Sequence, residues 1–290
     1  MKPKETAEHY ILSSSPHAHA DVSVRRLMLD VIIALLPTTA MGILFFGMPA
    51  VWTIAVCVSA ALVTEALCRI AMKRDNTIGD LSAVLTGLLL ALNLPAGIPL
   101  WMAAVGSVFA IGVAKQAFGG LGMNPFNPAL AARAFMLISF TGAMTTWSSS
   151  AWRGADAVTT ATPLAFIKKG ADGFDWSQMS LLKDLFLGNV NGCVGEVSAL
   201  ALLVGAAYLL WRKVITWHIP VAFIGTVFVF ALCKGGVPPL VHVLSGGVVL
   251  GACFMATDYV TSPTTAKGKL VFGCGAPALM ENGYLVMPYS

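Results

Sequence analysis

Apolar runs of bilayer length recur along this chain and are separated by short polar segments. A helix needs about 20 consecutive apolar residues to cross the hydrocarbon core of a membrane. The composition agrees, because 57% of the residues are hydrophobic and 11% are charged, too few charges for the surface of a soluble domain. The sequence therefore predicts an all-α polytopic membrane protein.

About eight transmembrane helices are expected from hydropathy and length. They cover 27–47, 50–70, 81–94, 99–118, 129–146, 194–211, 220–233 and 240–257. The third is short for a full crossing, and Asn93, Pro95 and Pro99 follow its apolar part. This segment is predicted to be tilted, broken or partly re-entrant, and such a place favours a ligand.

The spans divide the chain into consecutive parts. These are an N-terminal segment 1–26, a first transmembrane bundle 27–146, a loop 147–193, a second bundle 194–273 and an atypical end 274–290. An internal pseudo-repeat is a further expectation, because transporter-like folds often contain one. The two halves show no clear self-similarity in sequence.

Basic residues set the expected orientation. They lie in alternate connections: before the first span and after the second, sixth and eighth. These residues are Lys2, Lys4, Arg25, Arg26, Arg69, Lys73, Arg74, Arg212, Lys213, Lys267 and Lys269. The positive-inside rule places these cations in the cytoplasm. The N-terminus is then cytoplasmic, and the loop 147–193 lies on the outer face of a bacterial cytoplasmic membrane. Residues 1–22 are polar and resemble no signal peptide.

Four polar segments interrupt the apolar pattern, at 79–95, 114–135, 156–164 and 254–270. The second contains three glycines, followed by Asn124 and Asn127, each of which precedes a proline. Glycine and proline free backbone groups that lipid cannot satisfy, so this break belongs in packed protein or beside a cavity. Amide side chains both donate and accept, which matches a flavin or quinone ring. The other interpretation is a plain polar turn between spans.

The third segment, DAVTTATPL, is a threonine-rich stretch in the predicted outer loop. Thr159, Thr160 and Thr162 all offer hydroxyls there, which are either modified or merely solvated. The residues alone do not choose among the three. The pattern is also typical of a turn or a helix cap.

Acidic residues in or beside the spans are informative, because a carboxylate in a bilayer costs at least about 2.5 kcal/mol. Asp80 and Asp258 border the polar segments and are candidates for an ion pathway or a ligand pocket. Asp30 and Glu65 are expected near the interface. Their predicted partners are Arg25, Arg26 or Arg69.

The six cysteines show no CxxC spacing and the five histidines form no ligand pattern, so no metal site is predicted. Glycine motifs for phosphate or dinucleotide binding are absent from the sequence. Cys193, beside the predicted outer loop, is the one cysteine expected to be exposed.

Taken together and in order, these segments resemble the RnfD and NqrB family, whose members are membrane subunits of the Rnf electron-transport complex and of the sodium-translocating NADH:quinone reductase. The likeness runs from Ser15 to Gly273 and is carried by FGGLGMNPFNPA, DAVTTATPL, FMATDYVTSPTT and the approach SPHAHADVSVRRLMLDVIIALLP. The family has about ten spans. This chain ends in APALMENGYLVMPYS, where Glu281 and Asn282 interrupt a crossing, so its C-terminus is expected to be truncated or altered.

The resemblance implies covalent FMN, joined through its phosphate to a threonine by a separate flavin transferase. The acceptor is the threonine that follows alanine in the family's motif, which is Thr162 in this sequence. Asp156, Ala161, Pro163 and Leu164 complete the attachment motif.

The resemblance also implies a second, noncovalent flavin, riboflavin. Asn124 and Asn127 are its candidate contacts, with Asp80 and Thr86 as weaker ones. For the ion pathway the candidates are Asp80 and Asp258.

The predicted function is that of an electron-relay subunit in a complex that couples electron transfer between ferredoxin and NAD to transport of Na⁺ or H⁺. The flavin provides the redox chemistry, and no catalytic residue is assigned to this chain. The expected partners are the other subunits of the complex, the flavin transferase and membrane lipid, and no nucleic acid is expected. Two alternatives stay open: an NqrB-like subunit of the quinone reductase, and a secondary transporter without a redox cofactor.

Overall fold

The computed structural model describes residues 23–286 except 76, 148–178, 189–190 and 246. Within these residues the secondary structure is helical and contains no strand, as the sequence predicted. The α-helices are α1 Val24–Phe46, α2 Met48–Ala71, α3 Ser82–Leu92, α4 Leu100–Val108, α5 Pro128–Ser139, α6 Thr141–Met144, α8 Met179–Leu187, α9 Ala199–Trp211, α10 His218–Lys234, α11 Pro239–Leu244, α12 Val248–Leu250 and α13 Ala266–Val286. A 3-10 turn, η1 Ile78–Asp80, and two π-helices, η2 Phe109–Gln116 and η4 Gly251–Met255, complete the set.

The first two helices form a hairpin whose ends follow from the sequence. Ser23 caps α1 by accepting a hydrogen bond from the amide of Arg26 at 3.3 Å. Gly47 stands between the helices with a φ of 67°, a conformation that favours glycine, and reverses the chain within one residue. Pro49 lies in the first turn of α2, where its missing N–H costs no hydrogen bond.

Helices α1 and α2 have 23 and 24 residues and are long and apolar enough to cross a membrane by length and composition. They agree with the predicted spans 27–47 and 50–70. Five shorter apolar helices of 10–17 residues are also found among the described residues, one of them formed by α4 and η2 together. The expected number of about eight spans therefore stays a prediction.

Two of the predicted spans are interrupted in the structure, and another begins late. The span expected at 129–146 is divided into α5 and α6, and the span expected at 240–257 is divided into α11, α12 and η4. Helix α3 ends at Leu92 and is as short as the sequence predicted. The span expected at 194–211 becomes helical only at Ala199, after the cap Ser198. Backbone groups that lack a partner within their own helix are partly hydrogen-bonded to another segment. The amides of Val194 and Gly195, before α9, donate to the carbonyls of Leu94 and Leu92, at the end of α3, at 3.1 and 2.8 Å.

Two helices lie where the sequence predicted none. Helix α8 falls inside the predicted loop 147–193, and its Leu182 and Leu185 pack with Val241 of α11. Helix α13 crosses the predicted boundary at residue 273 and continues through residues 281 and 282. It packs against α10 so closely that a Cβ on Gly273 would lie 3.0 Å from the carbonyl oxygen of Ile219.

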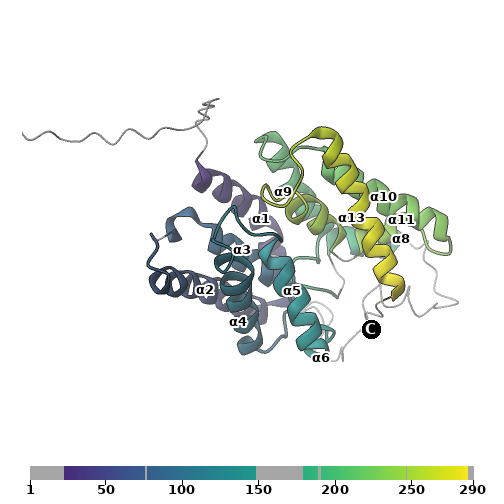
Figure 1. Ribbon diagram of the computed structural model, residues 1–290. Coiled ribbons are helices and arrows are strands. Elements are labelled where there is room, and N and C mark those ends of the chain that lie inside the picture. The colour runs from purple at the N-terminus through teal and green to yellow at the C-terminus, as the bar shows by residue number, and fades with distance from the viewer. Residues whose placement is uncertain (1–22, 76, 148–178, 189–190, 246, 287–290) are drawn as a thin grey trace, which may run out of the picture.

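Helices α1 to α6 gather on one side of the molecule and α8 to α13 on the other, and α1 packs against α9 between them (Figure 1). Glycine permits the closest approaches. A Cβ on Gly205 of α9 would collide with the carbonyl oxygen of Ala34, and a Cβ on Gly87 of α3 would lie 2.9 Å from the carbonyl oxygen of Cys57 in α2. Small residues serve this purpose in membranes, where helices associate through packing.

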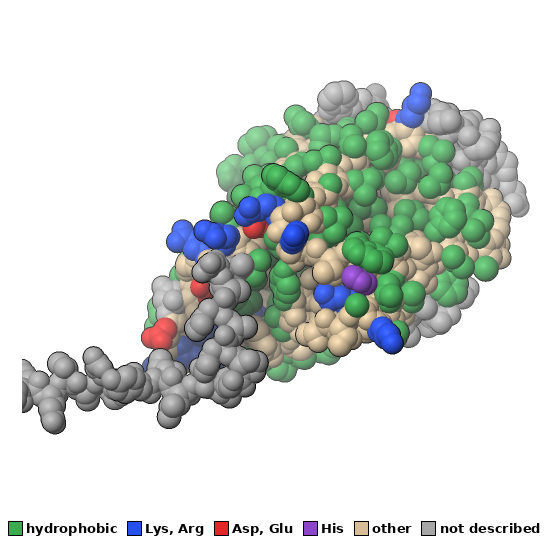
Figure 2. All heavy atoms as spheres, turned by 90° about the horizontal axis from the view of Figure 1, so that it is seen from above, with side chains coloured by type: hydrophobic (Ala, Val, Ile, Leu, Met, Phe, Trp, Pro, Cys, Tyr) green, Lys and Arg blue, Asp and Glu red, His purple; other side chains and the backbone are tan. Residues whose placement is uncertain are grey.

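Apolar side chains cover much of the face that Figure 2 shows, and cations gather in a few places. Ile138 is 78% exposed and Ile70 is 74% exposed, and exposure of many large apolar side chains is unfavourable in water. Exposed tryptophans stand at helix ends, with Trp52 and Trp101 in the first turns of α2 and α4 and Trp211 at the end of α9. Aromatic belts of this kind mark the two membrane interfaces.

Candidate functional site

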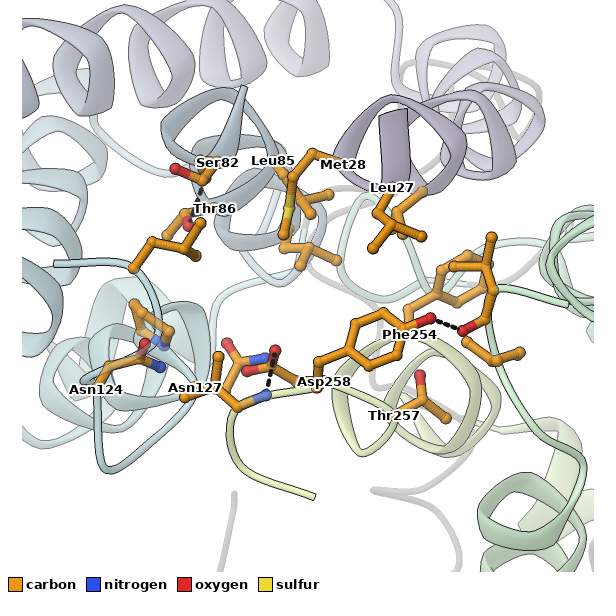
Figure 3. Close-up of a pocket in the computed structure, with 18 of the residues that line it drawn as sticks. Leu27, Met28, Ser82, Leu85, Thr86, Asn124, Asn127, Phe254, Thr257 and Asp258 are labelled. Atoms are coloured by element: carbon orange, nitrogen blue, oxygen red, sulfur yellow. Dashed lines mark hydrogen bonds between the residues drawn. The ribbon is translucent and has the colours of Figure 1, made fainter. Parts of the chain in front are cut away.

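A cavity lies between α1, α3, α9 and the segments that follow η2 and η4. The empty space of the cavity and its open mouth together is about 770 Å³. Figure 3 shows Asn124, Asn127 and Asp258 along one wall, with Met28 and Leu85 on the opposite wall. The cavity therefore combines apolar walls with a few polar groups, as ligand sites do.

The chain after η2 turns back through glycines. Gly119, Gly120 and Gly122 have φ values of 122°, 104° and 90°, which L side chains rarely adopt. Asn127 then caps α5, its Oδ1 accepting a hydrogen bond from the amide of Ala129 at 3.0 Å. This turn carries both asparagines to the cavity wall.

Each asparagine uses only part of its hydrogen-bonding capacity within the protein. Asn124 donates through Nδ2 to the carbonyl of Phe126 at 2.8 Å, and Asn127 accepts through Oδ1. Among the described residues no partner is found for Oδ1 of Asn124 or Nδ2 of Asn127. One acceptor and one donor therefore remain at the cavity wall for a ligand.

Thr86 and Asp258 also line the cavity. The Thr86 hydroxyl donates to the carbonyl of Ser82 at 2.8 Å. Asp258 follows η4, and its carboxylate accepts from the amide of Val260 and the hydroxyl of Thr261, both at 3.4 Å. Burial raises the pKa of Asp258 above its ordinary value of 3.8, and these two hydrogen bonds oppose the shift because they favour the charged form.

Lys115 of η2 reaches the cavity from a buried polar network. Its Nζ lies 2.9 Å from Glu65 Oε2 and donates to Ser82 Oγ at 2.7 Å, while the Thr77 hydroxyl donates to Glu65 Oε1 at 2.7 Å. The two charged side chains are 2% and 0% exposed. The expected arginine partner of Glu65 was wrong, because Lys115 from a distant helix pairs with it.

The other acidic residues lie outside the cavity. Asp30 is buried, accepts a hydrogen bond from Tyr208 at 3.1 Å and pairs with Arg212 at 3.2 Å, in place of the arginines that precede it in the sequence. Asp80 ends the 3-10 turn η1 and is not among the residues that line the cavity. Its predicted ligand and ion roles stay predictions.

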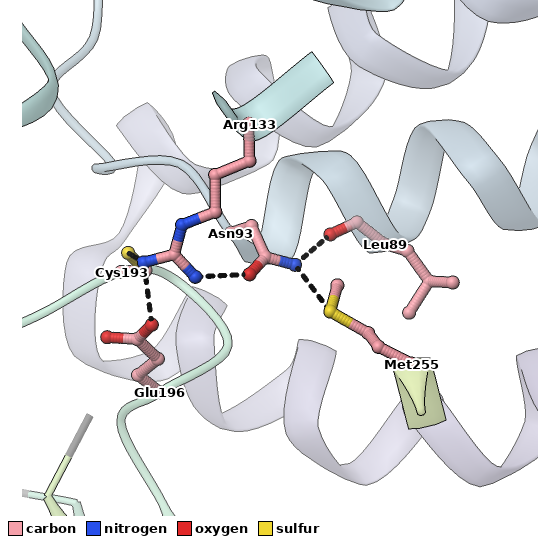
Figure 4. Close-up of polar contacts among 6 residues, drawn as sticks. All are labelled: Leu89, Asn93, Arg133, Cys193, Glu196 and Met255. Carbon is pink, nitrogen blue, oxygen red and sulfur yellow. Dashed lines mark hydrogen bonds and ion pairs between the residues drawn. The ribbon is translucent and has the colours of Figure 1, made fainter. Parts of the chain in front are cut away.

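A second polar cluster joins the interrupted helices (Figure 4). Arg133 of α5 donates to Asn93 Oδ1 at 2.6 Å and forms an ion pair with Glu196 Oε1 at 3.3 Å, and its Nη2 lies 3.8 Å from Cys193 Sγ. Asn93 in turn donates to the carbonyl of Leu89 at 2.7 Å. Sequence reasoning missed this cluster, although an arginine inside an apolar span was a usable signal.

The cysteine expected to be exposed is buried. Cys193 is 0% exposed because the segment before α9 packs inside the bundle beside Arg133. Cys233 and Cys274 are the exposed cysteines among the described residues. The attachment motif, with Asp156, Ala161, Thr162, Pro163 and Leu164, lies outside the described residues.

Long apolar helices, exposed apolar side chains and interrupted helices around a cavity are typical of an integral membrane protein. This chain belongs to the NQR2, RnfD, RnfE family, whose model matches residues 11–281. The resemblance found in the sequence is thereby confirmed.

Three relatives carry names that state their complex, and each is its D component. The relative from the Na⁺-translocating ferredoxin:NAD⁺ oxidoreductase complex of Acetobacterium woodii is 51% identical over 268 residues, which cover 91% of this chain and 82% of the relative. The relative from the proton-translocating ferredoxin:NAD⁺ oxidoreductase complex of Clostridium ljungdahlii is 45% identical over 291 residues, covering 95% and 88%. The relative from the ion-translocating oxidoreductase complex of Stutzerimonas stutzeri is 40% identical over 288 residues, covering 88% and 81%. These relatives are subunits of redox-driven ion translocases.

Proposed function

We propose that this chain is the flavin-carrying membrane subunit of an ion-translocating ferredoxin:NAD⁺ oxidoreductase complex. The names of its relatives support the complex, and the cavity supports a noncovalent flavin. The observation that supports a bound flavin is a mostly apolar cavity in which Asn124 and Asn127 keep one acceptor and one donor unused. The partners are the other subunits, a flavin transferase and lipid.

The residues present fit a flavin ring, which combines an apolar surface with an edge of donors and acceptors. Leu85, Leu89 and Phe254 offer apolar contacts, and the two asparagines offer polar ones. A bound riboflavin would supply the electron-transfer chemistry. The chain itself binds and orients the ring and excludes water from it.

The cavity can be tested with Asn127→Asp in the purified full-length protein. The carboxylate can still accept from the amide of Ala129, but it cannot donate to a ligand. Flavin released by acid, quantified by chromatography, should fall about tenfold, which corresponds to one lost hydrogen bond made to a ligand and one added buried charge. The same change at Asn93, outside the cavity, should leave the flavin content unaltered.

A wild-type preparation that is free of flavin would contradict the proposal and favour a transporter without a redox cofactor. Loss of flavin in the Asn93 variant to the same degree would also contradict it. The asparagine in the cavity would then have no specific role.

We further propose that Thr162 carries covalent FMN through a phosphodiester bond, in a loop on the outer face of the bacterial cytoplasmic membrane, with the N-terminus in the cytoplasm. The family resemblance supports this assignment, and basic residues support the orientation. After coexpression with a flavin transferase, the denatured wild-type band should fluoresce in a gel, and Thr162→Val should abolish the signal. Thr159→Val and Thr160→Val are matched controls that should keep it, and a dark wild-type band would refute covalent attachment.

For ion transport we propose Asp80 and Asp258 as pathway residues. Their support is position, since Asp258 lies at the cavity wall and Asp80 lies just before α3. The named ions of the relatives are Na⁺ in one and protons in another, so family membership leaves the coupling ion open. Ion uptake by vesicles that hold the assembled complex, driven by reduced ferredoxin and NAD⁺, should fall in Asp258→Asn.

A further inference from the structure

Polar groups that do not line the cavity lie beside the turn after η2. The Gln116 side chain is buried, with the residue 1% exposed, and neither its amide nitrogen nor its amide oxygen has a hydrogen-bond partner among the described residues. The Nε atom of Arg69 is likewise buried and unpartnered there. Buried polar groups are almost always hydrogen-bonded, so three orphaned atoms in one region require an explanation.

The side chains of Arg69 and Gln116 approach one backbone position. A Cβ on Gly120 would lie 2.6 Å from Arg69 Nη2 and 3.6 Å from Gln116 Oε1. A second guanidinium approaches the same turn, because Arg74 donates to the carbonyl of Gly119 at 3.0 Å. The Gly119–Gly120 turn therefore lies between two arginines and beside a free amide.

This site has an excess of positive charge. Within the described part of the chain no carboxylate lies within ion-pair distance of Arg69 or Arg74, and the nearby Glu65 is committed to Lys115. Guanidinium groups with free N–H donors bind phosphate strongly and often with two hydrogen bonds. The missing partner of the guanidinium and amide N–H groups is therefore an anion with several acceptor oxygens.

The surface beside the arginines is apolar. Val63, Leu67 and Ile70 of α2 are 57%, 61% and 74% exposed, and their spacing of four and three residues places them on one helix face. Phe118, at the end of the neighbouring η2 segment, is 54% exposed. A ligand that combines a phosphate with a long apolar chain fits this arrangement better than a free anion does.

We propose that Arg69, Arg74 and Gln116 bind the phosphate headgroup of an anionic phospholipid, with an acyl chain along the exposed face of α2. The positive-inside rule places this end of α2 at the cytoplasmic leaflet, where basic sites between helices meet anionic lipids. A side chain at position 120 would collide with Arg69 Nη2, so glycine leaves this guanidinium in its place. The proposal is independent of the flavin cavity.

The test is lipid binding to the purified full-length protein in detergent, measured by native mass spectrometry and by thermal unfolding. The probes are phosphatidylglycerol, the neutral lipid phosphatidylcholine and inorganic phosphate. Phosphatidylglycerol should remain bound and raise the unfolding temperature, and phosphatidylcholine should not. Arg69→Gln should weaken phosphatidylglycerol binding about tenfold, the size expected for lost charge-assisted hydrogen bonds.

Two further variants keep the test decisive. Arg25→Gln removes an exposed cation of the predicted cytoplasmic end of α1, and it should change binding less than about twofold if contact rather than general attraction holds the lipid. Gln116→Met removes the orphaned amide, so it should raise the unfolding temperature without lipid and reduce the further rise that lipid produces. A purely structural glutamine would not show that reversal.

Equal weakening in Arg69→Gln and Arg25→Gln would overturn the site in favour of general charge attraction. Equal stabilisation by inorganic phosphate and by phosphatidylglycerol would overturn the lipid as the source of the headgroup. Unchanged lipid binding in Arg69→Gln, together with loss of the other subunits from the purified complex, would assign the arginines to a protein partner.

Discussion

The two polar regions inside the bundle differ in how their hydrogen-bonding groups are used. In the cluster of Figure 4, Arg133 satisfies both Asn93 and Glu196. In the cavity of Figure 3, Asn124 and Asn127 each form one hydrogen bond with the neighbouring backbone. Each also keeps one polar atom without a protein partner at the cavity wall. A satisfied network fixes structure, whereas unused donors and acceptors around a cavity are what a ligand requires.

The largest effect is expected at the buried ion pair that borders the cavity. Lys115→Met leaves Glu65 charged and without its cation in a site where both side chains are buried. The free energy of unfolding should fall by about 3–5 kcal/mol, and the double variant with Glu65→Gln should recover much of this loss. Thermal or denaturant unfolding in detergent measures both, and equal losses in the single and double variants would contradict the pairing.

A smaller loss of stability is expected in the satisfied cluster. Arg133→Met removes the hydrogen bond to Asn93 and the ion pair to Glu196, with a cost of about 1–3 kcal/mol because the arginine side chain is 33% exposed. Noncovalent flavin per protein should stay at the wild-type level. Flavin loss at full stability would show that the comparison between the two regions is wrong.

In contrast to Arg133→Met, the cavity variant Thr86→Val should lose flavin and keep its stability. The hydroxyl bonds only to the carbonyl of Ser82 in its own helix, so its removal should change stability by less than about 1 kcal/mol. Flavin retention after gel filtration should nevertheless fall severalfold, because Thr86 lines the cavity. Thr39→Val, which removes a similar backbone-bonded hydroxyl from α1, is the matched control and should retain flavin.

The smallest effect concerns pH. Burial raises the pKa of Asp258 in the folded state, so between 3.8 and the raised value the folded protein holds more protons than the unfolded chain. Stability contributed by this group is therefore highest in acid and falls as the pH rises through that window. Asp258→Asn should flatten this part of the profile of unfolding temperature against pH, and an unchanged slope would assign it to another group.

The sequence was sufficient for features that depend on local pattern. Apolar length predicted α1 and α2, and the Asn-Pro pairs after the glycines predicted a break that belongs beside a cavity. The N-cap of α5 at Asn127 and the end of α3 at Leu92 also depend on neighbouring residues alone. Such features follow from a few neighbouring residues, which is why a single sequence shows them.

Long-range pairing could not be predicted in this way. Glu65 has Arg69 one helical turn away, yet it pairs with Lys115 because η2 packs across α2. Cys193 stands in a polar stretch that is typical of a surface loop, yet contacts with distant segments bury it. Neither partner is encoded near its residue, so the tertiary arrangement was needed.

The backbone bonds from Val194 and Gly195 to Leu94 and Leu92 carry a consequence for biosynthesis. The segment before α9 has no helix of its own to satisfy these amides, so it becomes stable in the membrane only where the end of α3 already offers its carbonyls. The N-terminal helices leave the ribosome first and provide that template. We therefore expect assembly of the protein to be vectorial, and these two amides should be among the last to exchange with deuterium in the finished fold.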